Sequence, residues 1–240
     1  MAGHSKWANI KRRKAAQDTT KNKARTRMIR EIIVAAQEAG TTNNPRLQLA
    51  VQNAKKNNVP KNKIEEAIKK ASGANSANYQ EIFYEAYAPH GIALVIKTQS
   101  DNNRRTVAIV RSVLTKYGGK LTSNNALAHL FTRKGLFTIQ KKEIKELETL
   151  TLTLVEAGID TLEEEEKKLY FTCPLALFHT IRKLLTTWEI TPEEMTIAHI
   201  PTTPVPISVA QAETVEKLIQ ALENEDDVQD VYENMTITTS

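Results

Sequence analysis

Cysteine is almost absent from the chain, and long apolar runs are missing altogether. The single cysteine, Cys173, excludes an internal disulfide. This fits a reducing compartment, so we expect a cytoplasmic protein. No stretch approaches the roughly 18 to 20 apolar residues that span a bilayer, and we therefore expect no membrane partner. The first residues also lack the apolar core of a secretory signal.

The residue patterns of common catalytic sites are missing too. The five histidines show no metal-ligand spacing with one another or with Cys173, and neither common type of phosphate-binding glycine loop occurs. Cys173 ends an apolar run, which favours a buried small residue over a nucleophile. The acidic run 163–166 favours a solvated loop over a cation site. We expect no enzyme: no catalytic residues, no metal, no cofactor and no small-molecule substrate.

Acidic residues are scarce at one end of the chain. Residues 1–72 hold 17 Lys/Arg against 5 Asp/Glu, a net charge of +12, whereas the rest carries −7 and the whole chain +5. A basic end joined to an acidic body favours a polyanionic partner. The alternative is a solvated helical surface with no partner, although solvated faces normally mix charges of both signs.

Residues 1–78 read as a basic helical domain. Apolar residues over Met28–Ala36 follow helical spacing until Gly40, which predicts the end of that helix. Asn44-Pro45 predicts the N-cap and first turn of a second helix. Pro60 begins a third. The apolar stripes are narrow and rich in alanine, which predicts a small, closely packed bundle.

Strand and helix patterns alternate after this domain. Residues 79–133 read as β-β-α-β, with Asp101 as the N-cap of the helix and the last strand around Leu127–Thr132. Residues 134–200 read as β-α-β-β-α-β, the ferredoxin-like split pattern. Residues 79–133 are short of one helix and one strand, and the C-terminal α-β unit can supply both. We expect an α+β fold of three domains: a helical bundle (1–78) and two ferredoxin-like α/β sandwiches, one (134–200) inserted in the other (79–133 and 201–240).

The strongest candidate site is the cation cluster near the N-terminus. Lys and Arg neutralise phosphates and release counterions, which gives salt-sensitive affinity with little sequence choice. Trp7 either stacks on an unpaired base or packs against the bundle beside Ile10. The stretch Lys11–Arg27 has almost no large apolar residue, so we expect it to be exposed, whereas Met28–Gly73 serves mainly as scaffold. The predicted nucleic-acid contacts are Lys6, Trp7, Lys11, Arg12, Arg13, Lys14, Lys21, Lys23, Arg25 and Arg27.

A second candidate lies at the start of the helix after Asp101. Arg104 and Arg105 fall in its first turn, where backbone N–H groups also attract anions. These two arginines either reach a phosphate or are solvated, and the residues do not decide between the two.

The opening segment MAGHSKWANIKRRKAAQD closely resembles the signature of the YebC-like family. That family includes bacterial proteins described as transcriptional regulators and the mitochondrial translational activator of cytochrome oxidase. The similarity continues through NPRLQLAVQNAKKNNVPKNKIEEAIKKASG and YQEIFYEAYAPHGIALVIKTQSDNNRRTVAIVR. The resemblance implies three domains, no known catalysis, and nucleic acid or the ribosome as partner. The usual YEGYGPGG is here YEAYAPHG, at 84–91, and the usual LGTDGSV is LTSNNAL, at 121–127.

The leading hypothesis is a monomeric nucleic-acid-binding regulator, specifically a DNA-binding regulator of transcription. The alternative is a ribosome-associated translation factor that binds ribosomal RNA and relieves stalling, for example at proline runs. A small-molecule-binding regulator built on the ferredoxin-like domains is a third class. The residues do not decide between duplex DNA and ribosomal RNA. The sequence shows no pattern of a recognition helix that would read the half-sites of a DNA operator.

Overall fold

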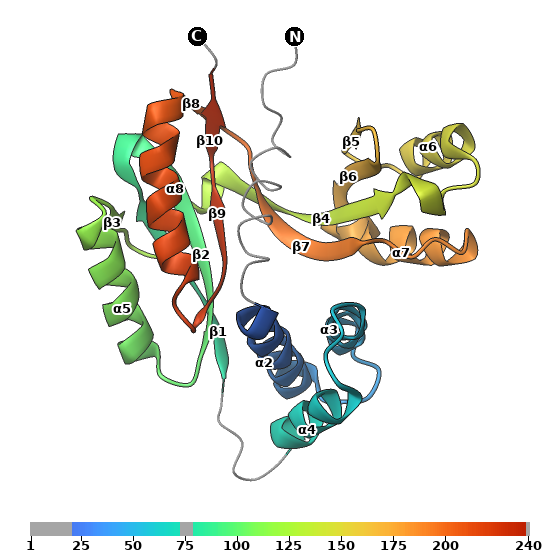
Figure 1. The fold of residues 1–240 in the computed structure, drawn as a ribbon, viewed down its shortest axis with the longest axis horizontal. Helices are drawn as coiled ribbons and strands as arrows, with labels where there is room; N and C mark the ends of the chain where they lie inside the picture. Colours follow the sequence, from blue (N-terminus) through green and yellow to red (C-terminus); the bar gives the residue numbers. More distant parts are fainter. Residues whose placement is uncertain (1–20, 73–78, 239–240) are drawn as a thin grey trace. The chain divides into compact units, whose positions relative to one another are not determined.

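The structure, a computed structural model, describes residues 21–72 and 79–238, with Lys21 and Asn22 described by their backbone alone. It confirms a mixed α+β fold with an N-terminal helical region and sheets of antiparallel strands (Figure 1). The described residues form two compact units, one within 1–130 and 201–240 and the other over residues 131–200. The finer division into three domains stays a prediction.

Three helices make up the helical region: α2 (Lys21–Ala39), α3 (Pro45–Lys56) and α4 (Lys61–Ser72). As predicted, α2 ends at Gly40, which adopts a positive φ of 71°. Asn44 caps α3 by accepting a hydrogen bond from Leu47 N, and its side-chain amide also donates to Ala35 O. The buried residues between the helices are mainly small or branched: Ile32, Ile33, Ala35, Ala36, Leu47, Ala50, Ala54, Val59, Ile64 and Ala67.

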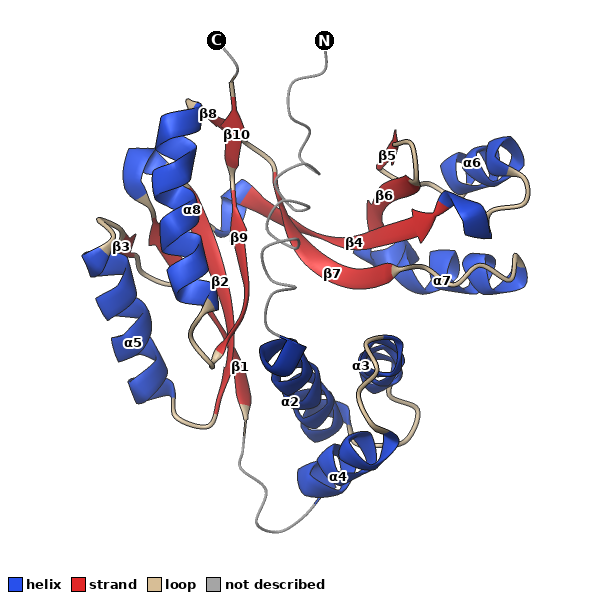
Figure 2. Ribbon diagram, in the orientation of Figure 1, coloured by secondary structure: helices blue, strands red, loops and turns tan. Residues whose placement is uncertain are grey.

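The first sheet joins segments from both ends of the larger unit. Its strands run in the order β3-β1-β2-β9, each antiparallel to its neighbour. Helices α5 and α8 pack on one face (Figure 2). The C-terminal helix and strand therefore complete the sheet of the middle block, as predicted. The elements are β1 (Gln80–Tyr87), β2 (Ala93–Ser100), α5 (Asn103–Lys116), β3 (Lys120–Leu121), α8 (Val209–Glu223) and β9 (Val228–Glu233).

The two faces of β2 differ in character because side chains alternate along a strand. Leu94 and Ile96 are fully buried in the apolar core with α5 and α8. Lys97 and Gln99 point to the opposite face, where both contact Glu31 of α2. Polar side chains thus connect helix α2 to this face of the sheet.

Two local predictions in this unit were wrong. Asn102, not Asp101, caps α5, because the Asn102 side chain accepts from Arg105 N at 3.1 Å. The segment before residue 131 is not a strand: Glu85 accepts hydrogen bonds from Asn125 N and Leu127 N, which holds the segment as a loop. The edge strand is instead the two-residue β3.

The second unit has the predicted β-α-β-β-α-β order, and its sheet runs β5-β6-β4-β7. Phe137 stacks on Phe171 across the β4–β6 pair, with ring centroids 4.9 Å apart, and Phe178 of α7 packs on Phe137. Short 3-10 turns at 141–143 and 175–177 precede its two helices. The elements are β4 (Phe131–Gln140), α6 (Leu147–Glu156), β5 (Thr161–Glu164), β6 (Lys168–Pro174), α7 (Phe178–Thr187) and β7 (Glu194–Pro201).

Two short strands in the larger unit were not predicted. β8 (Val205–Ile207) and β10 (Met235–Ile237) pair in parallel as a separate two-stranded sheet. β8 leads directly into α8, which begins with a capping box: Ser208 Oγ accepts from Gln211 N, and the Gln211 side chain accepts from Ser208 N.

Candidate nucleic-acid interface

The structure reaches only part of the predicted contact set. Six of those residues lie outside the described part of the chain: Lys6, Trp7, Lys11, Arg12, Arg13 and Lys14. Lys21 is the first residue of α2, and its side chain also lies outside the description. The remaining predicted contacts are Lys23, Arg25, Arg27, Arg104 and Arg105.

Three cations on one face of α2 reach the C-terminal end of α8. Lys23 Nζ donates to Asn224 O at 2.6 Å, and Arg27 Nη2 donates to Glu223 O. Arg30 Nη1 donates to Asp226 O. The three cations are spaced i, i+4 and i+7, which places them in one row along the helix. Two members of the predicted contact set therefore have partners within the protein itself.

The end of α8 attracts cations for a simple electrostatic reason. The last four carbonyl groups of a helix have no partner within it, and together they carry about half a negative charge. α8 has no basic residue in its own last turn. The α2 cations supply that charge instead. Any phosphate at Lys23 or Arg27 would have to compete with these carbonyls, whereas Arg25 on the same helix is exposed.

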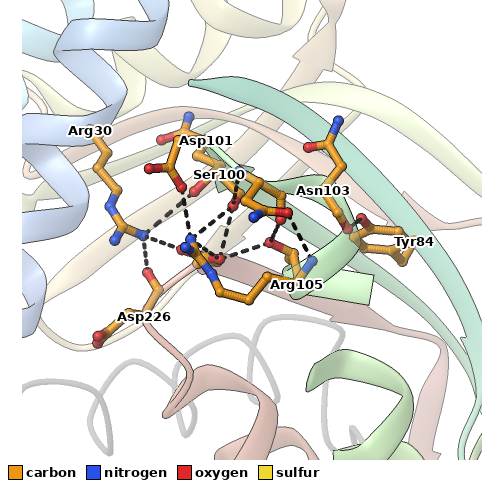
Figure 3. A network of polar contacts seen from close by, with 11 residues as sticks. Arg30, Tyr84, Ser100, Asp101, Asn103, Arg105 and Asp226 are labelled. Atoms are coloured by element: carbon orange, nitrogen blue, oxygen red, sulfur yellow. Dashed lines mark hydrogen bonds and ion pairs between the residues drawn. The ribbon is translucent and has the colours of Figure 1, made fainter. Parts of the chain in front are cut away.

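Asp227 is the centre of a polar network beside this helix end. Figure 3 shows Arg30, Ser100 and Arg105 of this network. The Asp227 carboxylate accepts from Ser100 Oγ at 2.9 Å and Thr106 Oγ1 at 2.8 Å, and it pairs with Arg30 and Arg105, each at 3.2 Å. Burial by itself raises the pKa of Asp227. The hydrogen bonds from Thr106, Ser100 and Arg105, with the charge of Arg30, outweigh burial and hold that pKa below its usual value.

The second predicted pair divides between two environments. Arg105 Nη2 contacts Asp101 Oδ1 at 2.8 Å as well as Asp227, so its guanidinium is held by two carboxylates (Figure 3). Arg104 and Arg105 are both exposed to solvent, but the two carboxylates contact Arg105. Any phosphate at Arg105 would have to compete with Asp101 and Asp227.

A further ionic cluster fastens α2 and α3 to the sheet. Arg46 of α3 bonds Glu31 of α2 at 2.8 Å and also bonds Glu81 of β1. Lys97 of β2 lies 3.5 Å from Glu31 and 3.3 Å from Glu81. Burial opposes both charges, yet attraction from Lys97 and Arg46 lowers the pKa of Glu31, and attraction from Glu31, Asp230 and Glu81 raises the pKa of Lys97.

Sequence reasoning missed Arg30 and Asp227. The row of Lys23, Arg27 and Arg30 at helical spacing is a signal that could have indicated one shared partner. Nothing in the sequence distinguishes Asp227 from its neighbours Glu225 and Asp226, since only folding brings it to Ser100 and α5.

A cavity of about 270 Å³ lies beside the network, with Arg30, Arg105 and Thr106 in its wall. It is slightly smaller than the roughly 300–1,000 Å³ of typical ligand pockets. Its two arginines already pair with Asp227. This cavity thus gives little support to a small-molecule site.

Other candidate chemistry is equally limited within residues 21–72 and 79–238. That part of the chain holds no group of three or more His, Cys, Asp or Glu side chains placed to bind a metal ion. Cys173 is fully buried, and burial together with nearby Asp160 raises the pKa of its thiol to about 11, which disfavours the reactive thiolate. None of the helices in these residues is long and apolar enough to cross a membrane.

The fold and its contacts define a mixed α+β protein whose basic helical region is fastened through ion pairs to an α/β sheet. Two family descriptions match nearly the whole chain. Residues 5–74 match the "TACO1/YebC protein N-terminal domain" and residues 79–235 match the "TACO1/YebC second and third domain". The chain belongs to the TACO1/YebC family.

Individual relatives agree with this assignment. A protein of Amoebophilus asiaticus named "probable transcriptional regulatory protein" is 43% identical over the full length of both chains. A Thermotoga maritima protein of the same name is 41% identical, over 98% of this chain and 93% of its own. The crystal structure of a conserved hypothetical protein, Aq1575 from Aquifex aeolicus, is similar with a TM-score of 0.85 and 34% identity, covering 93% of each chain.

Proposed function

We propose that this protein is a nucleic-acid-binding regulator of transcription that holds duplex DNA by its phosphate backbone. The observation that carries the proposal is the charge separation: +12 in residues 1–72 against −7 in the rest of the chain. A surface of this kind gives fast, salt-sensitive association with a polyanion. The relatives' name, "probable transcriptional regulatory protein", supports regulation as the role.

The contacts that we assign to DNA lie in the N-terminal stretch and at Arg104. The stretch contributes Lys6, Trp7, Lys11, Arg12, Arg13 and Lys14, with Arg25 following on the exposed side of α2. Lys21 belongs to the same basic run. Lys23, Arg27 and Arg105 join the set only by exchanging their internal carbonyl or carboxylate partners for phosphate.

The test is fluorescence anisotropy of labelled duplex DNA at a series of salt concentrations. We expect affinity to fall as salt rises. Replacing Lys11, Arg12, Arg13 and Lys14 with Ala should make the slope of log K against log salt shallower by about 0.9 for each phosphate that is no longer neutralised. An unchanged slope in the four-fold variant would remove that segment from the interface.

The choice between DNA and ribosomal RNA needs a second measurement. Crosslinking in cells, followed by sequencing of the bound DNA and RNA, reports the partner directly. Enrichment of promoter DNA supports the proposal. Enrichment of ribosomal RNA with no promoter DNA overturns regulation of transcription and favours the translation factor, in which exposed basic segments reach structured RNA.

A further inference from the structure

We propose that the turn between α3 and α4 is a second phosphate-binding surface, which contacts the sugar–phosphate backbone of nucleic acid alongside the N-terminal basic stretch. We call residues 55–63, KKNNVPKNK, the α3–α4 turn. It holds four lysines, three asparagines and no carboxylate. The inference rests on the proposed nucleic-acid binding, but it assigns a role to a segment that the sequence pattern indicated only as scaffold.

The backbone of the turn is fixed before any ligand arrives. Asn58 adopts a positive φ of 55°, and its N–H donates to Lys55 O. Val59 N–H donates to Ala54 O, and the Val59 side chain is buried in the bundle. This pair of hydrogen bonds is the Schellman motif that ends α3. The lysines on either side of the turn therefore extend from a rigid frame.

The side chains around this frame face solvent. Lys61 has a side-chain exposure of 86% and Lys63 of 53%. Lys55, Asn57 and Asn62 are exposed as well. Lysine ammonium groups and asparagine amides are both donors to phosphate oxygens, and contacts of this type carry no base sequence information. The surface therefore suits the backbone of a nucleic acid rather than its bases.

The helix dipole gives Lys61 and Lys63 no stabilising role at the start of α4. Both lie in the first turn of that helix, which contains no acidic residue. The N-terminal end of a helix carries partial positive charge and favours anions, so cations there oppose helix stability. Lys55 and Lys56 occupy the last turn of α3, where cations are favourable. The helix dipole therefore accounts for Lys55 and Lys56 but not for Lys61 and Lys63. An external anion would account for that second pair.

The acidic residues nearby leave these lysines available. Lys63 lies 2.8 Å from Glu66 and Lys61 lies 3.8 Å from Glu65, but all four side chains are more than half exposed. Exposed pairs of this kind are weak and are screened by salt. A phosphate displaces them more easily than it displaces the carbonyl and carboxylate partners of Lys23, Arg27 and Arg105.

The test compares two double variants of the full chain. Lys61→Gln with Lys63→Gln removes two charges from the α3–α4 turn, and Lys69→Gln with Lys70→Gln removes two exposed charges from the other end of the same helix. Binding is measured by anisotropy with a labelled duplex DNA and, separately, with a labelled RNA hairpin, each over a series of salt concentrations. Both probes carry a phosphodiester backbone. The probe whose binding weakens in the first variant identifies which nucleic acid, DNA or RNA, contacts the α3–α4 turn.

We expect the first variant to bind more weakly, with a salt slope shallower by about 0.7–0.9 for each phosphate that it no longer neutralises. The control should keep the wild-type slope. Equal weakening by the two variants would show an effect of net charge alone and overturn the proposal. So would an unchanged slope in the first variant while wild-type protein binds. Failure of wild-type protein to bind either probe would instead contradict the proposed function itself.

Thermal melting gives an independent readout. Removing two cations from the helix N-terminus should leave the melting temperature equal to or above that of the wild type. Weaker binding with undiminished stability is the expected combination. A lower melting temperature would assign Lys61 and Lys63 a structural role and overturn the inference.

Discussion

Arg30 of α2 and Asp227 of the loop before β9 form an ion pair of 3.2 Å, although 197 residues separate them in the chain. The pair connects the helical region to the last strand of the first sheet. Both side chains are largely buried, so removing either one takes a charged partner from the other in a poorly solvated environment. The same aspartate also holds the start of α5 through Thr106 and Arg105.

Replacing Asp227 with Asn should therefore lower the free energy of unfolding at neutral pH by about 1–3 kcal/mol. Asn keeps the size of the side chain but loses the charge that Arg30 and Arg105 require. Urea unfolding followed by circular dichroism measures the change. Asp226→Asn is the matched control, because Asp226 is exposed and contributes its backbone carbonyl to Arg30. An equal loss in both variants would contradict the role given to Asp227.

The pH dependence of stability should also change in the Asp227→Asn protein. The pKa of Asp227 is lower in the folded protein than its ordinary value. Its ionised form therefore adds stability that is fully present above the unfolded-state pKa of about 4 and is lost as pH falls through the lower native pKa. The Asn variant should lose less stability than the wild type on acidification. If the free energy of unfolding falls equally with pH in both proteins, Asp227 does not contribute to the pH dependence of stability.

The contact between α2 and the end of α8 makes a separate prediction. Arg27→Ala should lower the free energy of unfolding by about 1 kcal/mol, because the cation no longer satisfies Glu223 O. Arg25→Ala, at an exposed position on the same helix, should change stability by no more than about 0.5 kcal/mol. Chemical denaturation of the two variants tests the difference, and equal effects would show that the contact at Glu223 adds nothing.

Glu85 should determine the order of the segment 122–127. It is 8% exposed and accepts from Leu127 N at 2.5 Å and from Asn125 N at 3.2 Å. Glu85→Ala leaves two N–H groups without that acceptor, at a cost of about 1–3 kcal/mol. Amide hydrogen exchange in this segment should accelerate, and should accelerate less in Glu85→Gln, which keeps an acceptor oxygen. Unchanged protection in the Ala variant would contradict this account.

Local signals in the sequence predicted local structure well. Gly40 ended a helix and Asn44-Pro45 began one because turn and cap chemistry act over a few residues. One local prediction failed because of a distant partner. Leu127 was predicted to lie in a strand, but its N–H donates to Glu85, 42 residues away. Folding brings Asp227, 122 residues away, beside Arg105, and the contact of Arg105 with nucleic acid stays a prediction. Charge counts located the basic region, but tertiary contacts decide which of its cations are exposed.

The second unit, residues 131–200, contains a tight contact between Gly135 and Cys173. These residues face each other across the β4–β6 pair. A Cβ on Gly135 would lie 2.8 Å from Cys173 Sγ and 2.6 Å from Phe178 Cδ2. Gly135→Ala should therefore lower the free energy of unfolding by about 1–3 kcal/mol through overpacking. Adding Cys173→Ala removes the sulfur and should recover part of that loss, so the two changes should be coupled by at least about 0.5 kcal/mol in a double-mutant cycle. Strict additivity in urea unfolding would show that the added methyl group is accommodated elsewhere.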